Sequence, residues 1–129
     1  MGTTLTPPFA TAPARAQAIA ALGEANRVRL RRASLIRWMY GQSNAQSHDR
    51  AAELILEPDR ALSSMLVLDL LQRVRLVGPQ QAERLLTCAD IGLTCTVGAL
   101  TARQRAALAA LLRLRADQLS HRNRTRTAR

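Results

Sequence analysis

The chain has 129 residues, enough for one small domain and too few for two ordinary ones. Hydrophobic residues make up 47% of it but aromatic residues only 2%, so the core must be built from aliphatic side chains and alanine, which favours packed helices over sheet. The net charge of +10 points to a polyanion as partner, and no apolar run approaches the roughly 20 residues that cross a bilayer.

All 19 basic residues are arginine, whose guanidinium group can bind phosphate oxygens bidentately. A GC-rich genome is a competing cause of this bias, so the placement of the arginines weighs more than their number. Residues 1–50 carry seven arginines against two acids (+5), residues 51–90 four against six (−2), and residues 91–129 eight against one (+7). This distribution predicts a polyanion held by the first and last helices.

At the N-terminus, residues 1–12 contain Thr and Pro without periodicity and predict a flexible arm. An Ala-rich helix follows from about residue 13 to residue 40, with Gly41 as its stop. At 100° per residue, Val28, Leu35 and Met39 fall on one line, which predicts the packed seam of this helix.

The same helix carries crowded arginines. Like charges four residues apart cost a few tenths of a kcal/mol in an isolated helix, so these side chains would gain from an external anion; the alternative is a solvated charged face. The arginines that we expect to contact the polyanion here are Arg27, Arg31, Arg32 and Arg37.

In the middle of the chain, residues 42–47 predict a polar loop, and Ser47 or Asp49 can cap a short helix over residues 50–56. A third helix is expected to begin at Ser63 or Ser64, with apolar residues facing inward. A fourth is expected from about residue 79 to residue 89. The residues expected to be buried on these two helices are Met65, Val67, Leu70, Leu71, Val74, Ala82, Leu85 and Leu86.

The chain between the third and fourth helices predicts a tight glycine turn at Gly78, followed by Pro79 at a first helical position. A helix N-terminus carries unpaired N–H groups and a partial positive charge, so the amides of Gln80 and Gln81 should form a small phosphate site. Replacing Gly78 with valine should damage the turn, because a β-branched residue resists the positive φ expected there.

After a connector over residues 91–100, Thr101 and Gln104 form a capping box that opens the last helix. Its apolar residues, Ala107, Leu108, Leu111 and Leu112, repeat at helical spacing. Residues 120–129 are basic with nothing to bury and predict a disordered tail. The domain is therefore expected to span residues 13–119.

The two cysteines and two histidines lack the spacing of a zinc site, so we expect no metal and no cofactor. No leader or membrane span is apparent, which predicts a soluble, cytoplasmic protein.

Several segments, taken together, resemble the actinobacterial integration host factor family. They are ASLIR at 33–37, MLVLDLL at 65–71, VG at 77–78 with Ala82, and GALTARQRAAL at 98–108. The resemblance covers about residues 25–112. It implies an all-α fold, with a long N-terminal helix packed on a compact helix-two-turn-helix domain, and binding of duplex DNA with little sequence preference in the nucleoid.

Carried over position by position, the resemblance assigns DNA contacts to the turn at Gly78 with the amides after it, and to Arg103 and Arg105 at the start of the last helix. It also assigns contacts to the basic long helix. Two departures from the family are Pro79 and Gln81, at positions that are commonly basic there. The connector 94–98 likewise lacks the family's usual arginines, so a divergent member is implied.

We therefore expect a non-enzymatic, architectural DNA-binding protein, monomeric, with the turn, first helix and last helix sharing one surface. Contact with about six phosphates would give a slope of log K against log[salt] near −5. The alternative is RNA binding, since a ribosomal protein is similar in its helix-two-turn-helix. Some DNA glycosylases contain this helical element, but the N-terminal proline or glutamate nucleophile that they need is not visible in this sequence. Binding of the first helix to a membrane surface would need a wider apolar face than its arginines leave.

Overall fold

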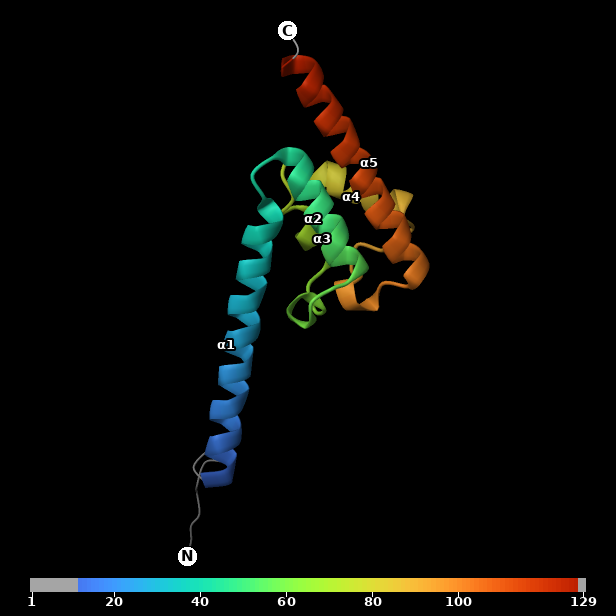
Figure 1. Cartoon of the computed structure of the whole chain (residues 1–129). Coiled ribbons are helices and arrows are strands. Elements are labelled where there is room, and N and C mark those ends of the chain that lie inside the picture. The colour runs from blue at the N-terminus through green and yellow to red at the C-terminus, as the bar shows by residue number, and fades with distance from the viewer. Residues whose placement is uncertain (1–11, 128–129) are drawn as a thin grey trace, which may run out of the picture.

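The structure, a computed structural model, describes residues 12–127, with side chains described through residue 122. Its fold is all-helical, as the composition predicts (Figure 1). The long helices are α1 (Ala12–Tyr40), α2 (Asn44–Leu56) and α5 (Ala102–Thr127), and the shorter ones are α3 (Val67–Leu71), α4 (Pro79–Cys88) and the 3-10 turns η2 (Arg60–Leu62) and η3 (Val97–Ala99). Within the described residues, no helix combines the length and apolar content that crossing a bilayer requires.

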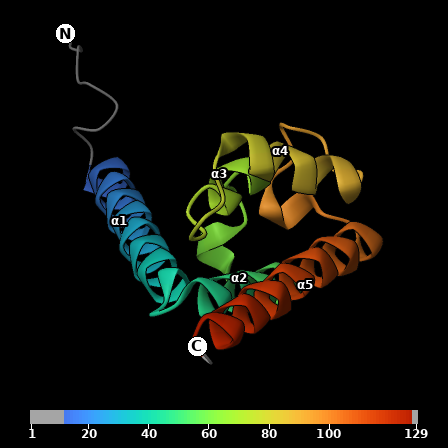
Figure 2. The ribbon, with the colours of Figure 1, turned by 90° about the horizontal axis from the view of Figure 1, so that it is seen from above.

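Helix α1 joins the body only through its C-terminal part. Leu35 and Met39 are buried and Val28 is half-buried, which confirms the predicted seam. The N-terminal half of the helix extends away from the other helices (Figures 1 and 2). Gly41, with φ of +67°, ends the helix as predicted, because glycine adopts this left-handed conformation at little cost.

Two arginines hold the C-terminal end of α1. Arg50 donates from Nη1 to the carbonyl oxygen of Trp38 at 2.6 Å, and Arg75 donates from Nε to that of Tyr40 at 3.1 Å. Each guanidinium also lies over the ring of the same residue, at 5.0 Å from the Trp38 centroid and 4.1 Å from the Tyr40 centroid. Cations at a helix C-terminus also complement its partial negative charge.

Helix α2 begins earlier than predicted, within the segment expected to be a polar loop. Ser43, rather than Ser47 or Asp49, is the N-cap, and its hydroxyl accepts from the Gln46 N–H at 3.0 Å. Ser47 is instead fully buried, where its hydroxyl accepts from the backbone N–H of Arg75 at 3.1 Å. No local sequence pattern reveals this long-range partner.

Helix α3 is shorter than predicted because the chain before it pairs with the connector. Leu66 and Thr96 form a single antiparallel bridge, with Val67 N–H donating to the Cys95 carbonyl at 3.0 Å and Val97 N–H to that of Met65 at 2.9 Å. These backbone groups are no longer available to a helix that starts at Ser63 or Ser64.

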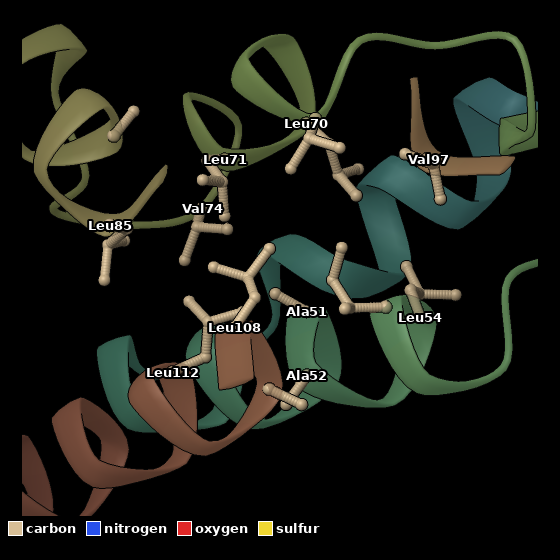
Figure 3. Close-up of a cluster of buried hydrophobic side chains, with 14 of the residues drawn as sticks. Ala51, Ala52, Leu54, Leu70, Leu71, Val74, Leu85, Val97, Leu108 and Leu112 are labelled. Atoms are coloured by element: carbon tan, nitrogen blue, oxygen red, sulfur yellow. The ribbon is translucent and has the colours of Figure 1, made fainter. Parts of the chain in front are cut away.

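The core lies where α2, α3, α4 and α5 meet (Figure 3). All the residues predicted to be buried on the third and fourth helices are buried, as are Leu108 and Leu112 of α5, while Ala107 and Leu111 are partly buried. The capping box is confirmed, since Gln104 N–H donates to Thr101 Oγ1 at 3.1 Å and Thr101 N–H to Gln104 Oε1 at 3.0 Å.

The predicted termini are only partly within the described part of the chain. Residues 1–11 of the expected arm and residues 128–129 of the expected tail lie outside it, and residue 12 already belongs to α1. Residues 120–127 of the expected tail continue α5 in the structure. No Gly or Pro interrupts the sequence there, so the backbone can remain helical.

Candidate nucleic-acid interface

An open groove of about 710 Å³ lies between the C-terminal end of α1 and the chain that joins α3 to α4. Figure 2 shows this connecting chain on the side of the body that faces α1. Three arginines line the groove, and no acidic residue is among its lining residues, which are Ile36, Arg37, Tyr40, Gln72, Arg73, Val74, Arg75, Leu76, Val77 and Gly78. The groove is therefore a concentration of positive charge.

The three arginines of the groove differ in how they are held. Arg75 is fixed at both ends, by its backbone N–H to Ser47 and by its Nε to the end of α1. Arg73 and Arg37 are exposed, and Arg37 makes only a long hydrogen bond, 3.5 Å from Nη2 to Ser34 Oγ. Exposed guanidinium groups beside a fixed one can adjust to phosphate oxygens.

Beside the groove, the N-terminus of α4 forms a second hollow of about 480 Å³, lined by Gly78, Pro79, Gln80, Gln81 and Arg84. Gly78 is the N-cap, Pro79 occupies the first turn, and no side chain caps the helix, as expected for an anion site. Gly78 lines both hollows, so the two adjoin at the N-terminus of α4.

The expected role of Gly78 in the turn is wrong in one respect. Its φ and ψ are −85° and −179°, an extended conformation open to any residue, and a Cβ added there would meet nothing within 4 Å. The left-handed residue of this turn is Leu76, with φ of 65°. The backbone at position 78 therefore accepts a residue with a Cβ, and the expected damage to the turn, which depended on a positive φ, has no basis.

Of the arginines predicted on α1, only Arg37 lies in the groove. Arg27 forms an ion pair with Glu24 at 3.0 Å, on the same helix. Arg31 forms one with Asp59 at 3.0 Å, and by helical geometry it lies about 120° around α1 from Arg37. The Ala61 N–H and then the Arg31 guanidinium hold the pKa of Asp59 below its usual value.

Arg32 joins α1 to the body rather than to the groove. It donates from Nε to the Ala61 carbonyl at 3.0 Å and from Nη2 to Ser64 Oγ at 2.9 Å. Together with Arg31, it binds η2 and the residues beside it. Two of the four arginines predicted on this helix thus fix its position.

The two arginines predicted at the start of α5 also separate. Arg103 is exposed, whereas Arg105 is half-buried and donates to three backbone carbonyls, those of Ile55 at 2.8 Å and of Val97 and Leu100 at 3.1 Å. Its donors are used inside the fold, because the connector turns beneath it. Arg105 therefore holds the connector to the body of the fold, and the prediction that it lies at the surface as a DNA contact is wrong.

Figures 1 and 2 place the first turn of α5 on the side of the body away from α1. The expectation that the turn, the first helix and the last helix share one surface is therefore wrong. The structure brings together Gly78, Gln80, Gln81 and Arg37, and it leaves Arg27, Arg31, Arg32, Arg103 and Arg105 elsewhere.

Sequence reasoning missed Arg73, Arg75 and Arg84, which line the two hollows. A signal was present, because the first two directly precede the turn and the third lies one helical turn into α4. The net charge over residues 51–90 is negative, so a charge count by segment does not indicate these three arginines as a binding surface. Counting charge by segment fails where acids and arginines of one segment face different sides.

A buried polar cluster outside the groove joins α2 to α5. His48 is fully buried, with Nδ1 2.8 Å from the Asn44 carbonyl oxygen, and its Nε2 accepts from Arg115 Nε at 3.2 Å. Since arginine can only donate, His48 is neutral with its proton on Nδ1. Burial, then Arg115, lowers the pKa of His48 below its usual value, despite opposing effects of the Asn44 carbonyl and Asp49.

Among the described residues, no three His, Cys, Asp or Glu side chains gather as metal ligands would. Cys88 and Cys95 are free thiols. Comparisons of the chain with protein-family models, with curated proteins and with solved structures found no match.

Proposed function

We propose that this protein is a non-enzymatic DNA-binding protein that holds the phosphate backbone of duplex DNA in the groove and at the adjoining N-terminus of α4. The observation that carries the proposal is the gathering of four arginines around that helix N-terminus, namely Arg37, Arg73, Arg75 and Arg84, with no acid lining either hollow.

Phosphate chemistry suits this surface in two ways. The backbone amides of Gln80 and Gln81, at the uncapped start of α4, can donate to one phosphate group. The arginines on both sides of Gly78 can bind the neighbouring phosphates along the same DNA strand. These contacts carry no base information, so binding with low sequence preference follows.

The described aromatic residues do not support recognition of single strands. The described residues include only two aromatic side chains, Trp38 and Tyr40, and an arginine lies over one face of each ring, so this part of the chain offers no row of rings on which successive bases could stack. This favours a duplex over unpaired RNA. An architectural role in a bacterial nucleoid rests on the family resemblance alone.

The test is a titration of unrelated duplexes with the full-length protein over a range of salt concentrations, followed by fluorescence anisotropy. About four phosphate contacts predict a slope of log K against log[salt] near −4. Arg73→Ala should weaken binding equally for every duplex and reduce the slope by roughly one. A slope near zero, or binding to one short sequence only, would remove the proposal.

Arg31→Ala is the matched control, because Arg31 is also an exposed arginine but is paired with Asp59 on the other flank of α1. It should leave the salt slope unchanged. If Arg31→Ala lowered the slope as much as Arg73→Ala, the broader contact surface expected from the sequence would be favoured over the groove. Preference for ribosomal RNA over duplex DNA in competition would favour the alternative function.

A further inference from the structure

Leu76 combines two unfavourable features at the edge of the basic groove. Its φ is 65°, a backbone conformation that residues other than Gly, Asn and Asp rarely adopt, and its apolar side chain is 62% exposed. Each feature costs free energy, and glycine at this position would avoid both. A strained residue on a surface is a candidate for a functional role.

The surroundings of Leu76 indicate what would cover it. It lines the groove together with Arg37, Arg73 and Arg75, and the N-terminus of α4 begins three residues later. A protein partner with a plain apolar surface would leave these cations unpaired. Duplex DNA matches the combination, because its phosphates surround an apolar stack of base pairs.

We propose that Leu76 is a wedge that enters between base pairs of the bound duplex and unstacks one step, while the arginines around it hold the phosphates. This inference rests on the proposed function and adds deformation of the DNA to it. Apolar side chains that act in this way kink the duplex, and the cost of unstacking favours flexible pyrimidine–purine steps.

The backbone around Leu76 can support such a wedge. The N–H of Arg75, the preceding residue, is bound to the buried Ser47, and the N–H of Val77, the following residue, donates to the Val74 carbonyl at 3.2 Å. Val74 and Val77 are themselves buried. The exposed leucine therefore stands on a fixed turn between two buried side chains.

The experiment uses the full-length protein and a duplex that carries 2-aminopurine at a central TA step, with protein at saturation as judged by anisotropy. The wild type should raise the fluorescence of the probe as its base unstacks. Leu76→Asn should abolish the rise, because asparagine tolerates the left-handed backbone but has no apolar side chain. Its salt slope should match that of the wild type, since no phosphate contact is lost.

Two controls separate the wedge from general effects. Leu76→Met keeps an apolar side chain and should retain the rise, whereas Leu93→Asn removes another exposed leucine, 53% exposed and outside the groove, and should also retain it. Thermal denaturation of each variant verifies folding.

The two proposals fail in distinguishable ways. If the wild type binds with a steep salt slope but its fluorescence does not rise, or if Leu76→Asn behaves like the wild type, the wedge is wrong and phosphate binding stands. If the wild type shows no salt-dependent binding to any duplex, the proposed function fails and the wedge fails with it.

Discussion

The groove and the packed side of the molecule, where α2, η3 and α5 meet, use the same residue types for different purposes. On the packed side, Arg105 and Arg115 donate to carbonyls and to His48 within the fold. In the groove, Arg37 and Arg73 are exposed beside an uncapped helix. An arginine count therefore does not locate a binding surface, and the partners already used by each guanidinium decide its role.

The sharpest test of this comparison is Arg105→Ala. It leaves three backbone carbonyls without their donor, and hydrogen bonds from a charged group contribute about 1.5–3 kcal/mol each in favourable cases. We expect a loss of about 2–4 kcal/mol in the free energy of unfolding, measured by urea denaturation. Its neighbour Arg103→Ala, at an exposed site, should change stability by less than about 0.5 kcal/mol.

Two glycines extend the test to the backbone. At Gly98, on the packed side, an added Cβ would lie 3.0 Å from the Ser63 carbonyl oxygen and 3.1 Å from the Ser63 Cβ, so Gly98→Ala should cost about 1–3 kcal/mol. At Gly78 the space is open, and Gly78→Ala should stay within about 0.5 kcal/mol. Equal effects in thermal melts would contradict the assignment of the two sides.

The pH dependence of stability tests the buried cluster. The pKa of His48 lies below its unfolded value of about 6.5. Neutral His48 therefore stabilises the fold above that pH, and the free energy of unfolding should fall as the pH drops below 6.5 towards the folded pKa, by at most about 1.4 kcal/mol per pH unit.

His48→Gln should lose this component of the pH dependence in urea denaturation at pH 5, 6 and 7, while His121 remains in both proteins. Arg115 on α5 and Asp49 on α2 are the charged groups that act on His48. Parallel stability curves for the two proteins would rule out His48 as the titrating group.

The smallest effect on stability is expected in the groove. Arg73→Ala should change the free energy of unfolding by less than about 0.5 kcal/mol, because the side chain is exposed, although the same variant should weaken binding. If Arg73→Ala were clearly destabilised, Arg73 would be a structural arginine like Arg105, and the contrast between the groove and the packed side would fail.

The helices could be predicted from the sequence where local signals were strong. Periodicity located Leu35, Met39 and the buried residues of α3, α4 and α5, and the Thr101 capping box marked the start of α5. Where a distant partner decided the outcome, prediction failed. Ser47 left the surface to meet Arg75, and pairing with the connector shortened α3.

The candidate site was predictable only in part. The turn at Gly78 and the basic end of α1 were found because glycine, proline and arginine carry local signals. That Arg31 pairs with Asp59 and that Arg105 points inward depends on contacts 28 and 50 residues apart, which no local pattern contains. The left-handed conformation of Leu76 had no signal, since leucine is not a turn residue.

Arg75 connects the groove to the end of the longest helix, because its Nε holds the last carbonyl of the 29-residue α1. A ligand that engages only the Nη atoms of Arg75 leaves this hydrogen bond in place. A ligand that drew the whole guanidinium away would remove one contact, while Arg50, Arg32 and the buried Leu35 and Met39 would still fix the C-terminal part of α1. The direction of this helix is therefore insensitive to what occupies the groove.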